Sequence, residues 1–448
     1  MLNEPKSCDD GDPAIYKHPA ELLKNLIRFD TTNPPGNEAE CINYINGLMK
    51  KAGFENHILA KDPNRPNLIT RLKGQGVAPP LLFYGHVDVV TTTSQDWTHP
   101  PFEAKEVDGF IWGRGALDMK CGVAMMVASL IRAKEEAVVP RGDILLAILS
   151  DEEAGGDFGA RYLVENHSEL FSGIRYAIGE FGGYSMYIGG KIFYPIQIAE
   201  KTACWFKATV RGPGGHGARP MRGGSMAKLG RLLSQLDKNR LPVHITPVTR
   251  RMIEAISSNL SFPKGVILRK LLVPALTGTI LKILGENAQY FEPLLHNTVN
   301  ATIVRGGNKI NVIPAEITVE LDGRLLPGFC PEDMMAELRQ IIGDEVEFEI
   351  LRHDPSPAGS DMGMFDTLSD ILYDADPEGI SVPLILPGIT DARFFSRLGI
   401  QTYGFMPMAL PAGFNFFQTI HAADERIPVE AMDFGTNAFF ELLKRYKG

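Results

Sequence analysis

Four apolar segments in the first half of the chain each end just before side chains that can bind a metal ion or transfer a proton. Those side chains are His86, Asp88, Asp118, Asp151, Glu152, Glu153 and Glu180. In an open α/β sheet, ligands bind in the crevice beyond the carboxyl ends of the strands. We therefore expect one histidine and several carboxylates to converge at one edge of a sheet.

A divalent metal ion is the partner that this set of residues favours. Carboxylates crowded together raise one another's pKa unless cations neutralise them. The set joins imidazole to carboxylate without thiolate, which suits zinc, cobalt or manganese better than magnesium or calcium. Taken singly, each residue has an ordinary explanation, such as a strand-end histidine, a helix N-cap or a solvated acidic turn. Their occurrence together at strand ends favours the metal.

The segments around these residues alternate between strand and helix character. The predicted strands are residues 67–72, 80–83, 109–112, 144–149 and 176–178. The predicted helices are residues 20–27, 38–52 and 120–137. The run at 144–149 is apolar without alternation, which is typical of a parallel strand buried on both faces. This rhythm predicts a doubly wound α/β sheet.

The order of predicted strands and helices changes near residue 200. Beyond it, the chain reads as strands at 204–210, 300–304, 316–321 and 346–351, with helices at 226–236 and 332–342. This order predicts a small α+β domain of ferredoxin-like type at residues 200–356, serving as a lid or for dimerisation. Residues 1–199 and 357–448 would form the catalytic domain. Its second part is predicted to hold helices at 364–373, 392–398 and 429–444 and a strand at 402–405.

Length, charge and cysteine usage narrow the class of protein. A chain of 448 residues exceeds what one hydrophobic core usually supports, and its net charge of −9 argues against a nucleic-acid partner. The 5 cysteines are scattered without a CxxC pair, which indicates reduced thiols; Cys121 lacks a His/Asn pair and reads as packing. The start of the chain does not resemble a signal peptide, and no apolar stretch approaches the roughly 20 residues of a membrane span. We expect a cytoplasmic protein for which a membrane is an unlikely partner.

Several motifs occur in a specific order: GHVDVV, GRGALDMKCGVA, SDEEAGG, GPGGHGARP, NVIP followed by DGRLLPG, GITDARFF, and a late His421. In order and spacing they resemble the dinuclear zinc hydrolases that include acetylornithine deacetylase, succinyl-diaminopimelate desuccinylase, aminoacylase and carboxypeptidase G. The motifs TDARFF and HAADERIP most resemble those of the carboxypeptidase S and N-acyl-amino-acid hydrolase branch. The resemblance extends from about residue 20 to the C-terminus.

The resemblance implies a division of the ligands between two metal ions. His86 and Glu180 would bind one ion, Glu153 and His421 the other, and Asp118 would bridge both. The cofactors are then two divalent metal ions, zinc first, with cobalt or manganese as alternatives. Two such ions form a clamp that can hold a hydroxide and polarise a carbonyl.

Three further residues receive roles in catalysis. The resemblance implies that Glu152 is the general base and then the general acid. Adjacent side chains at a strand end point apart, so Glu153 can be a ligand while Glu152 has this other role. Asp88 lies two residues after His86, on the same side of an extended chain, and could accept its second ring N–H. His216 would donate to the oxyanion from a glycine-rich loop, and in dimeric members of the family the equivalent histidine reaches the partner's site. The same loop also fits a GxGxxG dinucleotide motif, but its prolines argue against that function.

Asn311, Arg324 and Arg393 are the candidates for holding a substrate carboxylate, because a guanidinium can bind it bidentately. For a single arginine, a surface ion pair is the alternative. The predicted function is hydrolysis of an amide or peptide bond in an N-acyl amino acid or small peptide with a free carboxylate, by a metal-bound hydroxide. A catalytically silent binding protein or scaffold on the same fold is the alternative. A homodimer through the inserted domain is possible.

The segment at residues 241–296 is longer than a small lid domain requires. Its middle carries Lys264, Arg269, Lys270 and Lys282 with no acidic residue. It could pack the lid's own core or form a subunit contact. It could lie on a membrane surface, although Pro274 and Gly278 interrupt its face. A third hypothesis is that its helices form an apolar wall beside the metals, which would favour substrates with apolar acyl or side chains.

Overall fold

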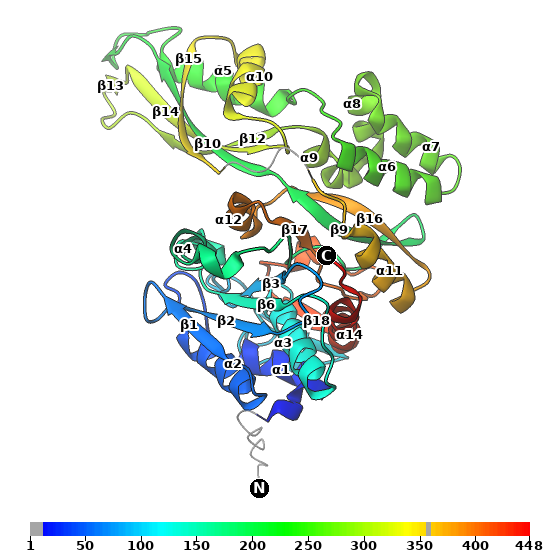
Figure 1. Ribbon diagram of the computed structural model, residues 1–448. Helices are drawn as coiled ribbons and strands as arrows, with labels where there is room; N and C mark the ends of the chain where they lie inside the picture. Colours follow the sequence, from blue (N-terminus) through cyan, green and yellow to red (C-terminus); the bar gives the residue numbers. More distant parts are fainter. Residues whose placement is uncertain (1–11, 355–359) are drawn as a thin grey trace. The chain divides into compact units, whose positions relative to one another are not determined.

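The computed structural model describes residues 12–354 and 360–448 (Figure 1). Cys8, most of the first 18 residues and the predicted domain boundary at residue 356 lie outside the described residues. The chain divides into two compact units. The first runs up to Ile198 and includes Asp361–Pro383 and Thr390–Gly448, and the second comprises Ala199–Ser360 and Leu384–Ile389. Each unit is described by itself.

Nine of the described strands form one mixed sheet. In order across the sheet they are β1 (Asn56–Ala60), β2 (Pro66–Leu72), β6 (Ile144–Leu149), β3 (Leu81–His86), β7 (Tyr176–Gly179), β17 (Gln401–Gly404), β9 (Lys191–Glu200) and β16 (Gly379–Leu386), with β8 (Met186–Ile188) on β9. The central neighbours β6, β3, β7 and β17 run parallel, whereas β1, β2 and β6 pair antiparallel. Every residue of β3 and β6 is buried, as the apolar run predicts for a parallel strand.

Helices cover both faces of this sheet. On one face, Leu82 and Tyr84 pack with α4 (Ala160–Asn166) and α12 (Ala392–Phe395). On the other, α3 (Lys120–Glu135) contacts β3 with α1 (Pro19–Ile27) and α14 (Val429–Arg445) beside it (Figure 1). The remaining helices of this unit are α2 (Ala39–Lys51), α11 (Phe365–Ala375) and α13 (Phe416–Thr419), with 3₁₀ turns at Pro13–Lys17, Glu152–Ala154, Ser168–Phe171 and Ser396–Leu398. The predicted α/β class is confirmed.

One predicted strand belongs elsewhere. β5 (Phe110–Trp112), which precedes Asp118, lies in a separate three-stranded sheet between β4 (Lys105–Val107) and β18 (Arg426–Pro428). Three rather than four of the apolar segments therefore enter the main sheet. The physical reason is that β5 finds its partner in β18, just after His421, and not in the parallel strands.

The second unit contains an antiparallel four-stranded sheet. Its order is β12 (Thr298–Arg305), β14 (Glu316–Leu325), β10 (Thr202–Arg211) and β15 (Val346–His353). The helices α5 (Ser225–Lys238) and α10 (Pro331–Ile342) pack on it around a shared apolar core. This βαββαβ order confirms the predicted α+β insert. A two-stranded ribbon joins β11 (Gly215–His216) to β13 (Val312–Ile313).

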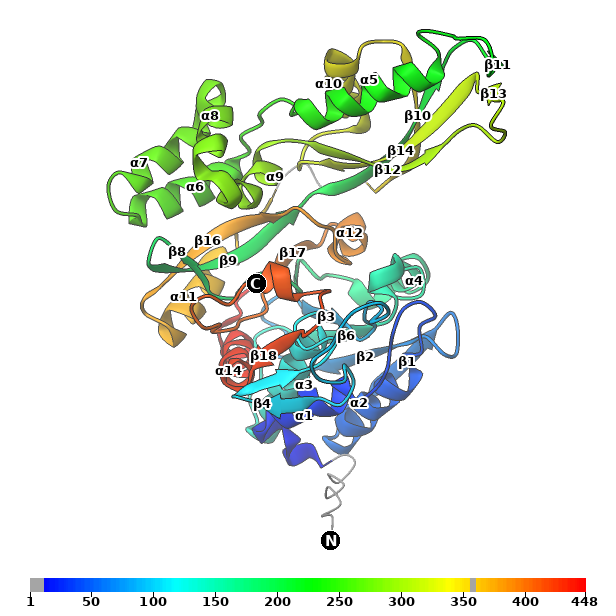
Figure 2. The same ribbon diagram turned by 180° about the vertical axis from the view of Figure 1, so that it is seen from behind.

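The long segment inside this unit folds as a helical group. Its helices are α6 (Pro247–Asn259), α7 (Lys264–Arg269), α8 (Pro274–Leu284) and α9 (Glu292–Leu295), with 3₁₀ turns at Lys270–Leu272 and Gly285–Tyr290. Figure 2 shows them gathered at one end of the unit, apart from α5 and α10. No helix among the described residues is long and apolar enough to cross a membrane.

Candidate metal centre

Three neighbouring parallel strands deliver the predicted residues to one edge of the sheet. His86 is the last residue of β3 and pairs in register with Leu149, the last residue of β6. Glu152 and Glu153 follow β6 in a 3₁₀ turn, and Glu180 directly follows β7. The parallel order of β6, β3 and β7 is thus what brings these side chains together.

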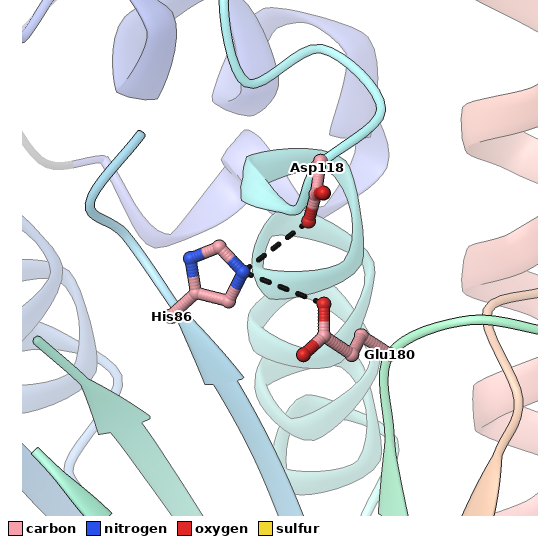
Figure 3. Close-up of side chains that lie close together, drawn as sticks. All are labelled: His86, Asp118 and Glu180. Atoms are coloured by element: carbon pink, nitrogen blue, oxygen red, sulfur yellow. Dashed lines mark hydrogen bonds and ion pairs between the residues drawn. The ribbon is translucent and has the colours of Figure 1, made fainter. Parts of the chain in front are cut away.

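His86, Asp118 and Glu180 form the first group of candidate ligands (Figure 3). The Nε2 atom of His86 lies 3.3 Å from Oδ1 of Asp118 and 3.5 Å from Oε2 of Glu180. All three residues are buried, and one ligand atom from each lies within 4.8 Å of the others. An ion among them would be enclosed by one nitrogen and two oxygen donors.

Asp118 also belongs to a second group, with Glu153 and His421. The Nε2 atom of His421 lies 3.0 Å from Oδ2 of Asp118 and 3.3 Å from Oε1 of Glu153. His86 approaches Oδ1 of Asp118 and His421 approaches Oδ2, so the two carboxylate oxygens face different groups. This is the arrangement that a bridging carboxylate needs.

The electrostatics of the two groups suit divalent cations. Burial raises the pKa of Glu180 to about 8, against the opposing effect of His86. Hydrogen bonds to Asp118 and Glu153 raise the pKa of His421 to about 10. A divalent cation among these donors favours deprotonated carboxylates and a neutral imidazole, so the imidazole–carboxylate set fits zinc-like ions.

Arg114 and Glu425 lie within the motifs GRGALDMKCGVA and HAADERIP but received no predicted role, and they connect the two candidate ligand loops. Glu425 Oε1 accepts hydrogen bonds from the backbone N–H groups of Leu117 (2.7 Å) and Asp118 (3.1 Å). Glu425 Oε2 accepts from Nη1 of Arg114 at 2.6 Å, and Nη2 of Arg114 donates to the carbonyl of His421 at 3.3 Å. Both charged side chains are buried. One ion pair therefore braces Asp118 and His421 together.

Asp88 organises the turn that carries the two glutamates. Its Oδ1 accepts from the backbone N–H of Glu152 and its Oδ2 from that of Glu153, each at 3.1 Å. The side-chain amide of Asn33 donates to Asp88 at 2.8 Å and to Asp151 at 3.1 Å. These bonds hold the turn from a segment far away in the sequence.

Arg65 neutralises the buried acids behind this turn. Its guanidinium lies 2.8 Å from Asp151 and 2.7 Å from Glu38, and all three side chains are buried. Paired in this way, the acids avoid the cost of isolated buried charges. Asn33, Arg65 and Glu38 carried no local signal in the sequence, because each sits in an ordinary polar stretch.

The contact between His86 and Asp88 differs from the expected one. Nδ1 of His86 lies 3.0 Å from the backbone carbonyl of Asp88 and 3.5 Å from its carboxylate. The carbonyl is the nearer acceptor because the carboxylate is engaged by the turn of Glu152 and Glu153. Either acceptor would leave Nε2 free to face the ligand groups.

Glu152 and Arg393 also belong to this unit. Burial raises the pKa of Glu152 well above its ordinary value, and Glu180 raises it further. Arg393 is buried and donates from Nη2 to the carbonyl of Gly155, in the turn after Glu153. Its Nε has no hydrogen-bond partner among the described residues. Arg393 therefore does not form a surface ion pair, which was the alternative to substrate binding.

His216, Asn311 and Arg324 belong to the second unit. His216 pairs with Val312 in the β11–β13 ribbon, and the N–H of Gly217 donates to the carbonyl of Asn311 at 2.8 Å, so the first two are neighbours. The guanidinium of Arg324 donates to both oxygens of Asp322, at 2.8 and 3.0 Å. Arg324 thus has an ion-pair partner within its own strand.

Cys121 is buried, and its thiol donates to the carbonyl of Leu117 at 3.3 Å. Burial raises its pKa far above the ordinary value, so the thiolate is disfavoured. Cys121 packs, as expected.

With this geometry in view, comparison with known proteins defines the class. The model of peptidase family M20/M25/M40 matches residues 82–445. The chain belongs to this family, and the predicted class of dinuclear metal-dependent hydrolase is confirmed.

Curated relatives agree with this assignment. A probable carboxypeptidase S-like protein from Dictyostelium discoideum is 28% identical over 380 residues, which cover 82% of this chain and 71% of that protein. An N-fatty-acyl-amino acid synthase/hydrolase from Homo sapiens is 28% identical over 379 residues, which cover 82% of this chain and 74% of that protein. The relatives thus include a carboxypeptidase-like protein and an acyl-amino-acid hydrolase.

Solved structures share the fold. An M20 family metallo-carboxypeptidase from Sulfolobus solfataricus matches with a TM-score of 0.67 at 17% identity, covering 96% of this chain and 99% of that one. Human carnosine dipeptidase 1 matches with a TM-score of 0.65 at 15% identity, covering 96% of each chain. At these identities the likeness concerns the fold alone.

Proposed function

We propose that this chain hydrolyses the amide bond of N-acyl amino acids or small peptides that carry a free carboxylate. The observation that carries the proposal is the pair of ligand groups sharing Asp118, with Glu152 on the same turn as Glu153. The names of the relatives, a carboxypeptidase S-like protein and an N-fatty-acyl-amino acid synthase/hydrolase, support this substrate class.

Five side chains would hold two divalent metal ions. His86 and Glu180 would bind one, Glu153 and His421 the other, and Asp118 both. When bound, two such ions activate a water molecule and polarise a carbonyl. Zinc suits the mixture of imidazole and carboxylate, with cobalt or manganese as alternatives.

Glu152 would accept a proton from the attacking water and return it to the leaving amine. A general base works best when its pKa lies near the working pH, and burial beside Glu180 moves the pKa of Glu152 in that direction. Asp88 supports this role because it holds the backbone N–H of Glu152 through one oxygen and that of Glu153 through the other. The two neighbouring carboxylates can therefore take different tasks.

Four polar residues are proposed to contact the substrate, as the family resemblance implies. Nε of Arg393 is a buried donor not committed to another residue among those described, which supports Arg393 as a ligand for the substrate carboxylate. Asn311 and Arg324 are proposed to share this task, although Arg324 must then exchange its bonds to Asp322. His216, exposed in the ribbon beside Asn311, is proposed to donate to the oxyanion.

A homodimer through the second unit is also proposed. β12 is an edge strand of the four-stranded sheet, and its Ile303 and Val304 are 41% and 50% exposed. An exposed apolar edge strand can pair with another chain. Sedimentation of the wild type and of Ile303→Lys would test this, with loss of the dimer in the variant as the expected result.

A cytoplasmic location remains part of the proposal. It rests on the cysteines: Cys41, Cys121, Cys204 and Cys330 are free, which suits a reducing compartment.

The test of the reaction is a screen of N-acyl amino acids and dipeptides with the zinc- or cobalt-loaded protein. Glu152→Gln should keep the metal content of the wild type and lose about 10²–10⁴-fold in turnover, because it removes the proton acceptor but no proposed ligand. Glu55→Gln, an exposed glutamate, is the matched control. Full activity in Glu152→Gln would refute the assigned role. A metal-loaded wild type that binds these compounds without cleaving them would favour the silent binding protein.

A further inference from the structure

The helices α7 and α8 lie in an unusual stretch of the chain. Between Glu254 and Glu286 the sequence contains no acidic residue, yet it carries four cations: Lys264, Arg269, Lys270 and Lys282. The whole chain has a net charge of −9. The positive charge of this stretch is therefore local and opposite to that of the protein.

Neither Pro274 nor Gly278 interrupts helix α8. Pro274 occupies the first turn of α8, where a proline's missing N–H costs nothing. Gly278 lies inside α8 with open space beside it. Both helices pack on the rest of the group through buried residues, including Leu268 on α7 and Leu281 on α8. The segment is a folded helical pair with an inner and an outer face.

Five large apolar side chains on or beside these two helices are exposed. The exposed fractions are 86% for Phe262, 53% for Val266, 40% for Val273, 40% for Leu276 and 62% for Ile283. Leu276 and Ile283 are seven residues apart on α8 and so lie on the same face. Single exposed apolar residues are ordinary, whereas five large ones in one short segment are a feature that often marks an interaction site. We call these five residues and the four cations the α7–α8 surface.

The cations of this surface are available to a partner. All four are exposed. In the described parts of the chain, no carboxylate forms a salt bridge with any of them, although many other surface arginines and lysines are paired. An occupant must therefore offer both apolar contact and negative charge.

These two requirements decide between the candidate occupants. Packing into the unit's own core does not apply, because the side chains are exposed. In a two-fold dimer centred on this surface, the surface would meet itself, which brings four cations against four cations. An anionic bilayer supplies acyl chains for the apolar side chains and phosphate or carboxylate headgroups for the cations.

We propose that the α7–α8 surface docks on the surface of an anionic lipid bilayer. Phe262 and Ile283 enter the boundary between headgroups and acyl chains, and the four cations contact the lipid charges around them. The helices lie on the bilayer and do not cross it. The proposal does not depend on the catalytic residues, since it concerns one helical group of the second unit.

The experiment is co-sedimentation of the full chain with large vesicles of phosphatidylcholine alone and with about one third phosphatidylserine. We expect binding to the phosphatidylserine vesicles only, weakened when salt is raised from 0.05 to about 0.5 M because screening shortens the reach of the charges. Replacing the four cations with glutamine should lower partitioning by about fivefold for each charge removed. Phe262→Ser with Ile283→Ser should lower it with the charges intact.

Two controls keep the result interpretable. Lys50→Gln with Lys191→Gln removes exposed cations outside the surface and should leave binding at the wild-type level. All variants must match the wild type in thermal unfolding, which separates lost docking from lost folding. The proposal is overturned if the wild type fails to bind phosphatidylserine vesicles, or if the four-glutamine variant binds as well as the wild type. It is equally overturned if the surface variants change the oligomeric state and leave vesicle binding unaltered, which would make the surface a subunit contact.

Discussion

Glu425→Gln is the sharpest test of how the metal centre is held, because it alters neither a proposed ligand nor the proposed base. The carboxylate is fully buried and accepts three hydrogen bonds, from Arg114, Leu117 and Asp118. Glutamine keeps the shape but has a single acceptor oxygen and an NH₂ group in place of the other. Either Arg114 or the Asp118 loop must then face a donor.

The structure sets the size of the effect. Hydrogen bonds to a charged group are worth about 1.5–3 kcal/mol each. Removing one partner of a buried ion pair costs about 3–5 kcal/mol, much of it from the charge left unpaired. Arg114 also holds the carbonyl of His421, so the second ligand group loses support on two of its three members. The first group keeps His86 and Glu180 untouched, and we expect the second ion to weaken by about 10–100-fold, more than the first.

Competition with a chromophoric chelator measures both dissociation constants. Glu430→Gln, an exposed glutamate nearby in the sequence, is the matched control. If Glu425→Gln fails to fold, Arg114→Lys keeps the charge and loses the forked contact, and it should weaken the same ion to a smaller degree. Two unchanged dissociation constants in a folded variant would show that the ion pair does not position the ligands.

Three further outcomes follow from the same geometry. Asp118→Ala should lose both ions, since its two oxygens face different groups, and metal analysis that finds two equivalents would rule out a bridge. Zinc binding to the metal-free protein near pH 7.5 should release protons and strengthen as pH rises, because Glu180 (pKa about 8) and His421 (pKa about 10) must deprotonate to bind. Calorimetry in buffers of different ionisation enthalpy measures this release, and the same binding enthalpy in all of them would contradict it. Asn33→Ala should cut turnover or metal affinity by about 10–100-fold, measured by kinetics and metal titration, because the side-chain amide that donates to both Asp88 and Asp151 is lost.

The ligand-bearing strands could be predicted because their signals are local. The apolar runs of β3, β6 and β7 mark strands buried on both faces, and His86, Glu153 and Glu180 stand at or just beyond their ends. Parallel strands share an edge, so convergence follows from the pattern alone. The division of these ligands between two ions came from the family resemblance.

Two strands with an internal proline were not predicted from the sequence. β9 contains Pro195 and β16 contains Pro383, and a proline within a run argues against a strand because it removes a ladder donor. In the structure both strands belong to the main sheet, next to each other at one end. Tertiary pairing outweighs the local preference there.

The residues that hold the candidate ligand loops in place could not be predicted for a different reason. Glu425 is separated from Asp118 by 307 residues and Asn33 from Asp151 by 118, so no spacing rule connects either pair. A glutamate or an asparagine in a polar stretch reads as surface, and only the folded chain reveals that it is buried and shared between loops. Asp118 itself depends on this long-range order: its strand β5 pairs with β18, and the same pairing brings Glu425 and His421 beside it. Asp118, the proposed bridging ligand, is carried by a loop outside the main sheet and is held there by the β5–β18 ladder and the Arg114–Glu425 ion pair. Weakening either support should therefore first disturb the ion that Asp118 is proposed to share with His421.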